Sequence, residues 1–232
     1  MGSTAELGKL TQTEKAYTAL KRAILRGEIE EGVFLSESDM MRRFRIGRTP
    51  YREACNRLHH ERLLEVVPRR GYHVPEVSYQ AVSAIFETRL ILEAANAELA
   101  CLRATDQDLE ELNRLAGRPP RSDSPEQDFA RLIQANTDFH LCLAKTTRNR
   151  ELVELLTRNL EKTERLMYIE LRCSRFRDTE FQLLHNRIVD ALRTRNPQLA
   201  REAVLNDISE AQSATLSFGK NWPSLARPAT LV

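Results

Sequence analysis

The stretch SESDMMRRFRIGRTPYREACNRLHH, residues 36–60, decides how the N-terminal third of the chain folds. Ser36 can accept a hydrogen bond at the start of a helix that continues to Phe44. After a break at residues 45–47 a further helix begins with Pro50 in its first turn, where the missing N–H costs little. The stretch therefore predicts two helices joined by a tight turn.

The flanking residues extend this pair of helices into a small domain. Upstream, Tyr17, Leu20 and Ile24 recur at three- and four-residue spacing, which predicts a helix from about residue 11 to a stop at Gly27. Downstream, two short β-prone segments flank a Pro-Arg-Arg-Gly turn. Residues 11–76 are thus predicted to form a winged helix-turn-helix with three helices and a two-stranded wing.

Arginines concentrate on the predicted helix-turn-helix and wing. Residues 42–73 contain nine arginines and three acids, although the net charge of the whole chain is only +2. Arg48 and Arg52 are four residues apart and share one face of the third helix, with Thr49 in the same turn. The first turns of such a helix can contact base edges and phosphates in the major groove of DNA. An ordinary solvated basic surface is the alternative.

After Pro75 the pattern changes to long amphipathic helices. They are predicted at residues 79–103, 106–116, 125–147, 150–173, 178–194 and 197–217. None of these segments favours a strand, so we expect an all-α antiparallel helical bundle and a chain that is mostly α. Residues 1–10 and 219–232 lack this periodicity and are expected to form a flexible N-terminus and a C-terminal tail.

Four polar residues fall on helix faces that are otherwise apolar and should point into the bundle: Asn136, His140, His185 and Asp207. Each needs a polar partner there, because an unpaired buried polar group costs about 1–3 kcal/mol. They can be satisfied core residues, but bundles also build ligand and metal sites from side chains on facing helices. The sequence predicts a polar site in the bundle core and leaves both alternatives open.

Arg89 lies on the apolar stripe of the helix predicted at residues 79–103. Its guanidinium suits a carboxylate ligand in the same pocket. Glu93, one turn further on, offers an internal salt bridge as the alternative.

The N-terminal domain resembles the winged helix of the GntR family of bacterial regulators. The resemblance rests on residues 27–37, 48–54 and 63–71, and the spacing between them matches throughout residues 11–76. It implies that the chain binds a double-stranded DNA operator.

The same resemblance implies which residues make the operator contacts: Arg48, Thr49 and Arg52 on the recognition helix, Ser36 beside it, and Arg70 with Gly71 on the wing. Arg70 and Gly71 would enter the minor groove. Two residues depart from the family pattern, since Gly47 stands where serine is usual and Ser38 stands where several members have a DNA-contacting arginine. These departures affect which operator sequence is bound.

Residues 79–218 resemble the FCD effector domain of the FadR-type branch of this family, in its shorter, six-helix version. The residues that carry the resemblance are Arg89 with Glu93, Asn136 with Phe139-His140, Asn149 with Leu152, and His185 before Ile188. It implies a homodimer held mainly by the helical domain and an effector, such as a small organic acid, bound inside the bundle.

Many members of that branch bind a divalent metal through an Asp-x-x-x-His pair and two further histidines. This chain keeps His140 and His185 but has Asn136 in place of the aspartate and Asp207 in place of the third histidine. These four side chains can still hold zinc, nickel or manganese, with water and an effector carboxylate completing the shell. The alternative is a metal-free pocket in which the same groups and Arg89 bind the effector directly.

We therefore expect a sequence-specific DNA-binding transcription regulator, by default a repressor whose dimer changes conformation when the effector binds. An enzyme is not expected, because a metal-dependent hydrolase would need a positioned general base that the sequence lacks. An architectural DNA-binding protein without an effector response would explain the arginines but not the inward polar residues.

The chain is expected to be cytoplasmic. No apolar run approaches the length needed to span a bilayer, and the N-terminus lacks the apolar stretch of a signal peptide. The four cysteines, which are Cys55, Cys101, Cys142 and Cys173, are widely spaced and are expected to be reduced thiols.

Overall fold

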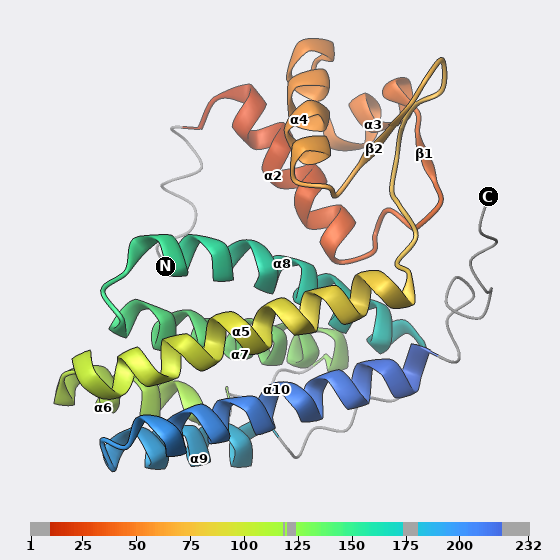
Figure 1. The fold of residues 1–232 in the computed structure, drawn as a ribbon. Coiled ribbons are helices and arrows are strands. Elements are labelled where there is room, and N and C mark those ends of the chain that lie inside the picture. Colours follow the sequence, from red (N-terminus) through yellow and green to blue (C-terminus); the bar gives the residue numbers. More distant parts are fainter. Residues whose placement is uncertain (1–9, 118, 120–123, 174–180, 220–232) are drawn as a thin grey trace. The chain divides into compact units, whose positions relative to one another are not determined.

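The computed structural model describes residues 10–117, 119, 124–173 and 181–219 of the 232-residue chain (Figure 1). Three predicted features lie outside these residues. They are the two tails apart from residues 10 and 219, the loop after Gly117 apart from residue 119, and residues 178–180 of the helix predicted at 178–194. The chain divides into two compact units, Met1–Val77 and Ser78–Val232, and each is described by itself.

In residues 10–77 the N-terminal unit has three helices and a small antiparallel sheet (Figure 1). Its elements are α2 (Gln12–Leu25), β1 (Phe34–Leu35), α3 (Glu37–Phe44), α4 (Arg48–His60), β2 (Glu65–Val67) and β3 (Gly71–His73). The predicted helices are confirmed. The predicted two-stranded wing is also confirmed, as the antiparallel pair β2 and β3. Strand β1, which was not predicted, pairs with the other edge of β3 and makes a third strand.

Short-range contacts set the ends of these helices. Thr11 and Glu14 form a capping box that starts α2. The Oγ atom of Ser36 accepts a hydrogen bond from the backbone N–H of Asp39 and caps α3, as the sequence predicts. Arg45 adopts a left-handed conformation, with φ of 54°, and ends that helix. The turn between α3 and α4 is therefore fixed by local chemistry.

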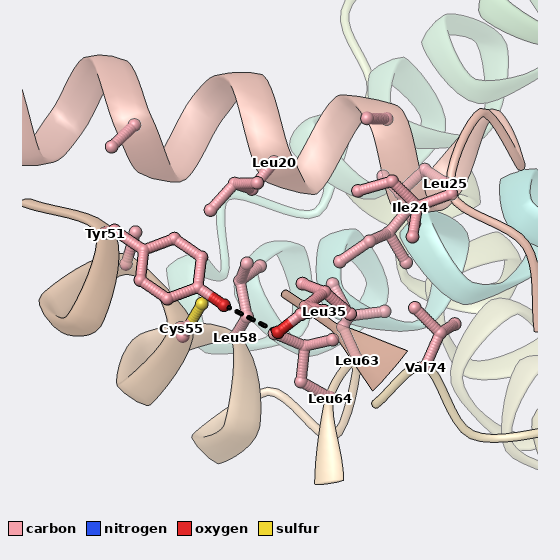
Figure 2. Close-up of a cluster of buried hydrophobic side chains, with 14 of the residues drawn as sticks. Leu20, Ile24, Leu25, Leu35, Tyr51, Cys55, Leu58, Leu63, Leu64 and Val74 are labelled. Carbon is pink, nitrogen blue, oxygen red and sulfur yellow. Dashed lines mark hydrogen bonds between the residues drawn. The ribbon is translucent and has the colours of Figure 1, made fainter. Parts of the chain in front are cut away.

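One apolar core holds the N-terminal unit together (Figure 2). Leu20 and Ile24 of α2 pack against Leu58 of α4, and all three are fully buried. The hydroxyl of Tyr51, also buried, donates a hydrogen bond to the carbonyl of Leu35, so α4 is tied to β1. The apolar side of α4 is thereby anchored, and its first turn is left at the surface.

The C-terminal unit is an all-helical bundle. Its helices are α5 (Tyr79–Arg103), α6 (Asp106–Ala116), α7 (Pro125–Thr146), α8 (Arg150–Cys173), α9 (Phe181–Arg193) and α10 (Pro197–Gly219). Consecutive helices alternate in direction (Figure 1). The capping box predicted at Thr105 and the cap predicted at Ser124 are both present.

Helix α5 is the central element of the bundle, because it packs against α7, α8, α9 and α10. This is why its buried residues do not form a single stripe but spread around much of the helix. Any polar residue on its inner side faces other helices rather than water.

The cysteines that the structure describes are free. Cys55, Cys101 and Cys142 form no disulfide, while the side chain of Cys173 lies outside the described residues. Among the described helices, none is both long and apolar enough to cross a membrane.

Candidate functional site

The first turn of α4 presents Arg48, Thr49 and Arg52 at the surface of the N-terminal unit. Gly47 is the N-cap of this helix and offers no capping side chain, so the exposed N–H groups of the first turn can bind an anion. The side chains of Arg48 and Arg52 are more than half exposed. The predicted recognition residues thus lie together on one accessible surface.

Glu37 of α3 holds both arginines. Its carboxylate lies 2.5 Å from Nε of Arg48 and 3.2 Å from Nη2 of Arg52. The hydrogen bond from Arg48 is the largest cause of the lowered pKa of Glu37, and Arg52 adds to it. Glu37 belongs to the motif at residues 27–37, but no role was predicted for it. The sequence alone does not show that α3 packs beside both arginines of α4.

The tip of the wing carries the other predicted operator contacts. Gly71 has a φ of 91°, a left-handed conformation that glycine adopts without strain. The guanidinium of Arg70 lies 3.9 Å from the centre of the Phe34 ring, which holds the arginine against the sheet. Ser36 lies at the start of α3 as its cap, so its first role is to position that helix.

A second polar cluster lies inside the helical bundle. His140 of α7, His185 of α9 and Asp207 of α10 are all buried, and one candidate ligand atom from each lies within 4.8 Å of the others. Nε2 of His140 is 3.4 Å from Oδ2 of Asp207, and Nε2 of His185 is 3.9 Å from Oδ1. Three helices that are separate in sequence therefore bring their polar side chains to one point.

Packing against neighbouring side chains orders this cluster. The His185 ring stacks on Phe139, with ring centres 4.0 Å apart and planes 10° from parallel. Asn136 is buried on the same face of α7 as His140, one turn earlier. The predicted four-residue set is thus buried in one region of the bundle.

Arg89 and Glu93 of α5 form a buried ion pair that touches the cluster. Nε of Arg89 is 2.7 Å from Oε1 of Glu93, and both side chains are almost wholly inaccessible to solvent. Oε2 of Glu93 lies 2.5 Å from Nδ1 of His140, and Nη2 of Arg89 lies 3.3 Å from Nε2 of the same ring. The predicted salt bridge between Arg89 and Glu93 is therefore present. Glu93 also contacts His140 of the cluster, and this contact was not predicted.

The environment shifts the protonation of three of these groups. Burial raises the pKa of Glu93, but Arg89 and His140 outweigh it and bring this pKa down to about 2. Burial, followed by the nearby His140 and Arg89, moves the pKa of His185 well below its ordinary value, so its ring is neutral near pH 7. Burial raises the pKa of Asp207, although His140 and Arg89 oppose this shift.

These donors suit a divalent cation. A neutral imidazole and a carboxylate oxygen are ligands that zinc, nickel and manganese accept. Two ligand atoms of one zinc ion, each at about 2.1 Å, are at most about 4.2 Å apart. The two separations that involve Asp207, 3.4 and 3.9 Å, are within that limit, and the three candidate ligand atoms together lie within 4.8 Å of one another.

The two units together define a class of protein. An exposed basic helix-turn-helix with a wing binds DNA, and a helical bundle with buried polar groups can bind a small ligand. The chain is a ligand-responsive transcription regulator rather than an enzyme.

The chain belongs to the GntR family. Residues 12–74 match the family described as bacterial regulatory proteins, gntR family, and residues 84–210 match the FCD domain. GntR regulators bind DNA operators through the first domain and effectors through the FCD domain.

Several named regulators are similar along most of the chain. The Uxu operon regulator of Haemophilus influenzae is 28% identical over 212 residues, which cover 82% of this chain and 78% of the relative. The transcriptional repressor GlaR of Escherichia coli is 29% identical over 159 residues, which cover 67% of this chain and 72% of the relative.

Solved structures share the fold. E. coli McbR/YncC aligns with a TM-score of 0.72 and 20% identity, covering 90% of this chain and 98% of that chain. A GntR regulator from Rhodococcus gives the same TM-score at 21% identity and covers 90% and 99%. The winged helix followed by a helical domain is thus a known arrangement.

We predict that Glu93→Gln strongly destabilises the protein, because it leaves the buried guanidinium of Arg89 without its counter-charge. The expected loss in the free energy of unfolding is about 3–5 kcal/mol, measured by urea denaturation. The matched control is Glu111→Gln, which breaks the exposed pair with Arg114 and should leave the unfolding midpoint nearly unchanged. Equal effects of the two substitutions would show that the buried pair has no special role.

We predict that Arg48→Ala and Arg52→Ala each abolish operator-specific binding in a protein that remains folded. A good bidentate contact between arginine and guanine contributes about 1–3 kcal/mol of base discrimination. Gel shifts at moderate salt, with an operator selected from random DNA, measure this loss. Arg114→Ala, a surface arginine of the bundle, is the control and should bind normally. A gel shift that neither α4 substitution changes would contradict the assignment.

Proposed function

We propose that this protein is a repressor released by a small carboxylate effector, with residues 11–76 as its DNA-binding domain and residues 79–218 as its effector-binding and dimerisation domain. The observation that carries the proposal is the buried convergence of His140, His185 and Asp207 around the Arg89–Glu93 ion pair. A core that served stability alone would have little need for so many ionisable groups. Since an operator lies in the cytoplasm, the protein would act there.

We infer that the cluster holds a divalent cation. His140 and His185 would supply Nε2 atoms, Asp207 a carboxylate oxygen, and Asn136 an amide oxygen from the neighbouring turn of α7. Two imidazoles and one carboxylate match a zinc, nickel or manganese site with positions left for other ligands. Nη2 of Arg89, which lies near Nε2 of His140, would have to turn away from that atom.

The cation would supply the positive charge that binds the effector carboxylate. Arg89 is a poor candidate for this task, because Glu93 already neutralises it at 2.7 Å. A buried carboxylate ligand needs a counter-charge, since burying an unpaired charge is very costly. The proposed effector therefore binds in the presence of the cation and only weakly without it.

Effector binding would act through the helices that carry the site. His140, His185 and Asp207 belong to α7, α9 and α10, so a ligand held by all three favours one packing of these helices. A ligand that binds one conformation better than another shifts the population toward it. In a dimer, such a shift changes the spacing of the two recognition helices and with it the affinity for a two-half-site operator.

The proposed dimer would form through the exposed side of α5. Ile91 and Leu102 are 66% and 72% exposed there, on a side that Ala95 also shares. We propose an antiparallel pair of α5 helices with its two-fold axis near Ala95, in which the apolar sides of the two copies, each carrying Ile91 and Leu102, pack on each other. A self-complementary apolar face of this kind supports a second copy of the chain as its occupant.

We predict near-stoichiometric zinc, nickel or manganese in gently purified protein and none in His140→Ala, because the variant loses one of the three ligands. Elemental analysis provides the measurement. His60→Ala, which changes an exposed histidine of α4, is the control and should keep its metal. Protein that takes up none of the three metals on incubation would instead have a metal-free pocket, and metal-dependent release from the operator would then also be absent.

We predict that Ile91→Glu converts the dimer to a monomer, since it places a charge in the apolar side of α5, one turn from the proposed two-fold axis. Sedimentation at micromolar concentration measures the mass. Leu155→Glu, an equivalent change at an exposed leucine of α8, is the control and should remain dimeric. A monomeric unsubstituted protein, or a dimer that Ile91→Glu leaves intact, would contradict the proposed interface.

A further inference from the structure

Asn96 lies on the inner side of α5, beside the residues of the proposed effector site. It follows Arg89 by seven residues and Glu93 by three, so all three side chains share one stripe of the helix. All three are buried, and Asn96 is fully inaccessible to solvent. At 1.5 Å per residue, Asn96 lies about 4.5 Å beyond Glu93 along the helix axis.

The side chain of Asn96 makes no hydrogen bond within the described part of the chain. Both polar atoms are buried: the oxygen Oδ1 has no donor and the nitrogen Nδ2 has no acceptor. Buried polar groups in folded proteins are almost always satisfied, and an amide with both ends unbonded is unusual. The amide therefore calls for a hydrogen-bonding group that none of the described residues supplies.

Buried aliphatic residues lie about one turn from the cluster on the three helices that carry it. They are Leu143 after His140, Ile188 after His185 and Val204 before Asp207, and all are buried. Asn96 is thus a buried polar group one turn beyond Glu93, the residue of α5 that contacts His140.

We propose that Asn96 binds the effector, and that the effector is a small acid with a hydroxyl group three to five bonds from its carboxylate. The carboxylate would bind at the cluster of His140, His185 and Asp207. The hydroxyl would both accept a hydrogen bond from Nδ2 of Asn96 and donate one to Oδ1. This inference rests on the proposed function, because it takes the carboxylate site as given.

Matched acids test the proposal by isothermal titration calorimetry on zinc-saturated protein. The probes are butanoate and pentanoate beside 4-hydroxybutanoate and 5-hydroxypentanoate. We expect at least one hydroxy acid to bind about tenfold or more tightly than its parent, because a buried amide left unpaired penalises the ligand that lacks the hydroxyl. Asn96→Leu should remove this preference, and Asn206→Leu, at an exposed position of α10, should keep it.

The stability of the ligand-free protein provides a second measurement. Asn96→Leu keeps the number and branching of side-chain atoms but removes the unsatisfied amide, so the unfolding temperature should rise by about 2–4 °C or more. An amide that a buried water satisfied for structural reasons would give a lower unfolding temperature instead, and this result would overturn the proposal.

The outcomes separate this inference from the proposed function. Equal binding of hydroxy acids and parent acids, or a hydroxyl preference that survives in Asn96→Leu, overturns the role of Asn96 and leaves the carboxylate site standing. If none of the four acids binds zinc-saturated protein, the effector class named here is wrong. Failure of the proposed function itself would appear as operator binding that no metal and no acid changes.

Discussion

The buried ion pair between Arg89 and Glu93 is the contact on which the interior of the bundle depends. Two opposite charges are tolerable in an apolar core only when they compensate each other. Here the second oxygen of Glu93 also faces Nδ1 of His140, so the pair fixes which ring nitrogen turns toward Asp207. The orientation of the proposed metal ligands thus follows from a salt bridge on a different helix.

The fold could be predicted from sequence wherever periodicity and caps agree. Helices α5 to α8 begin and end where their apolar spacing and the caps at Thr105 and Ser124 indicate. Strand β1 could not be predicted, because a strand of two residues is too short to show an alternation of apolar and polar side chains. Phe34 and Leu35 become a strand only when β3 lies beside them, and that proximity depends on the whole unit.

The interior site was predictable only in part, for a physical reason. His140 and His185 were found because each interrupts an apolar stripe on an amphipathic helix. Helix α5 packs against four other helices, so most of its circumference is buried and no polar face contrasts with the rest. Asn96 therefore gave no signal, and the contact of Glu93 with His140 joins helices whose packing the sequence does not specify.

Glu37 and Glu93 each pair with arginine, but their surroundings give them opposite roles. Glu37 is partly exposed, so its pairs with Arg48 and Arg52 are screened by water and can be exchanged for DNA phosphates or bases. Glu93 is fully buried, and separating it from Arg89 would strand two charges in the core. Arg48 and Arg52 can therefore exchange their partner for a ligand at little cost, whereas Arg89 cannot. The anionic effector that we propose would then find its counter-charge in the cation proposed at the histidine and aspartate cluster, and a neutral contact at Asn96.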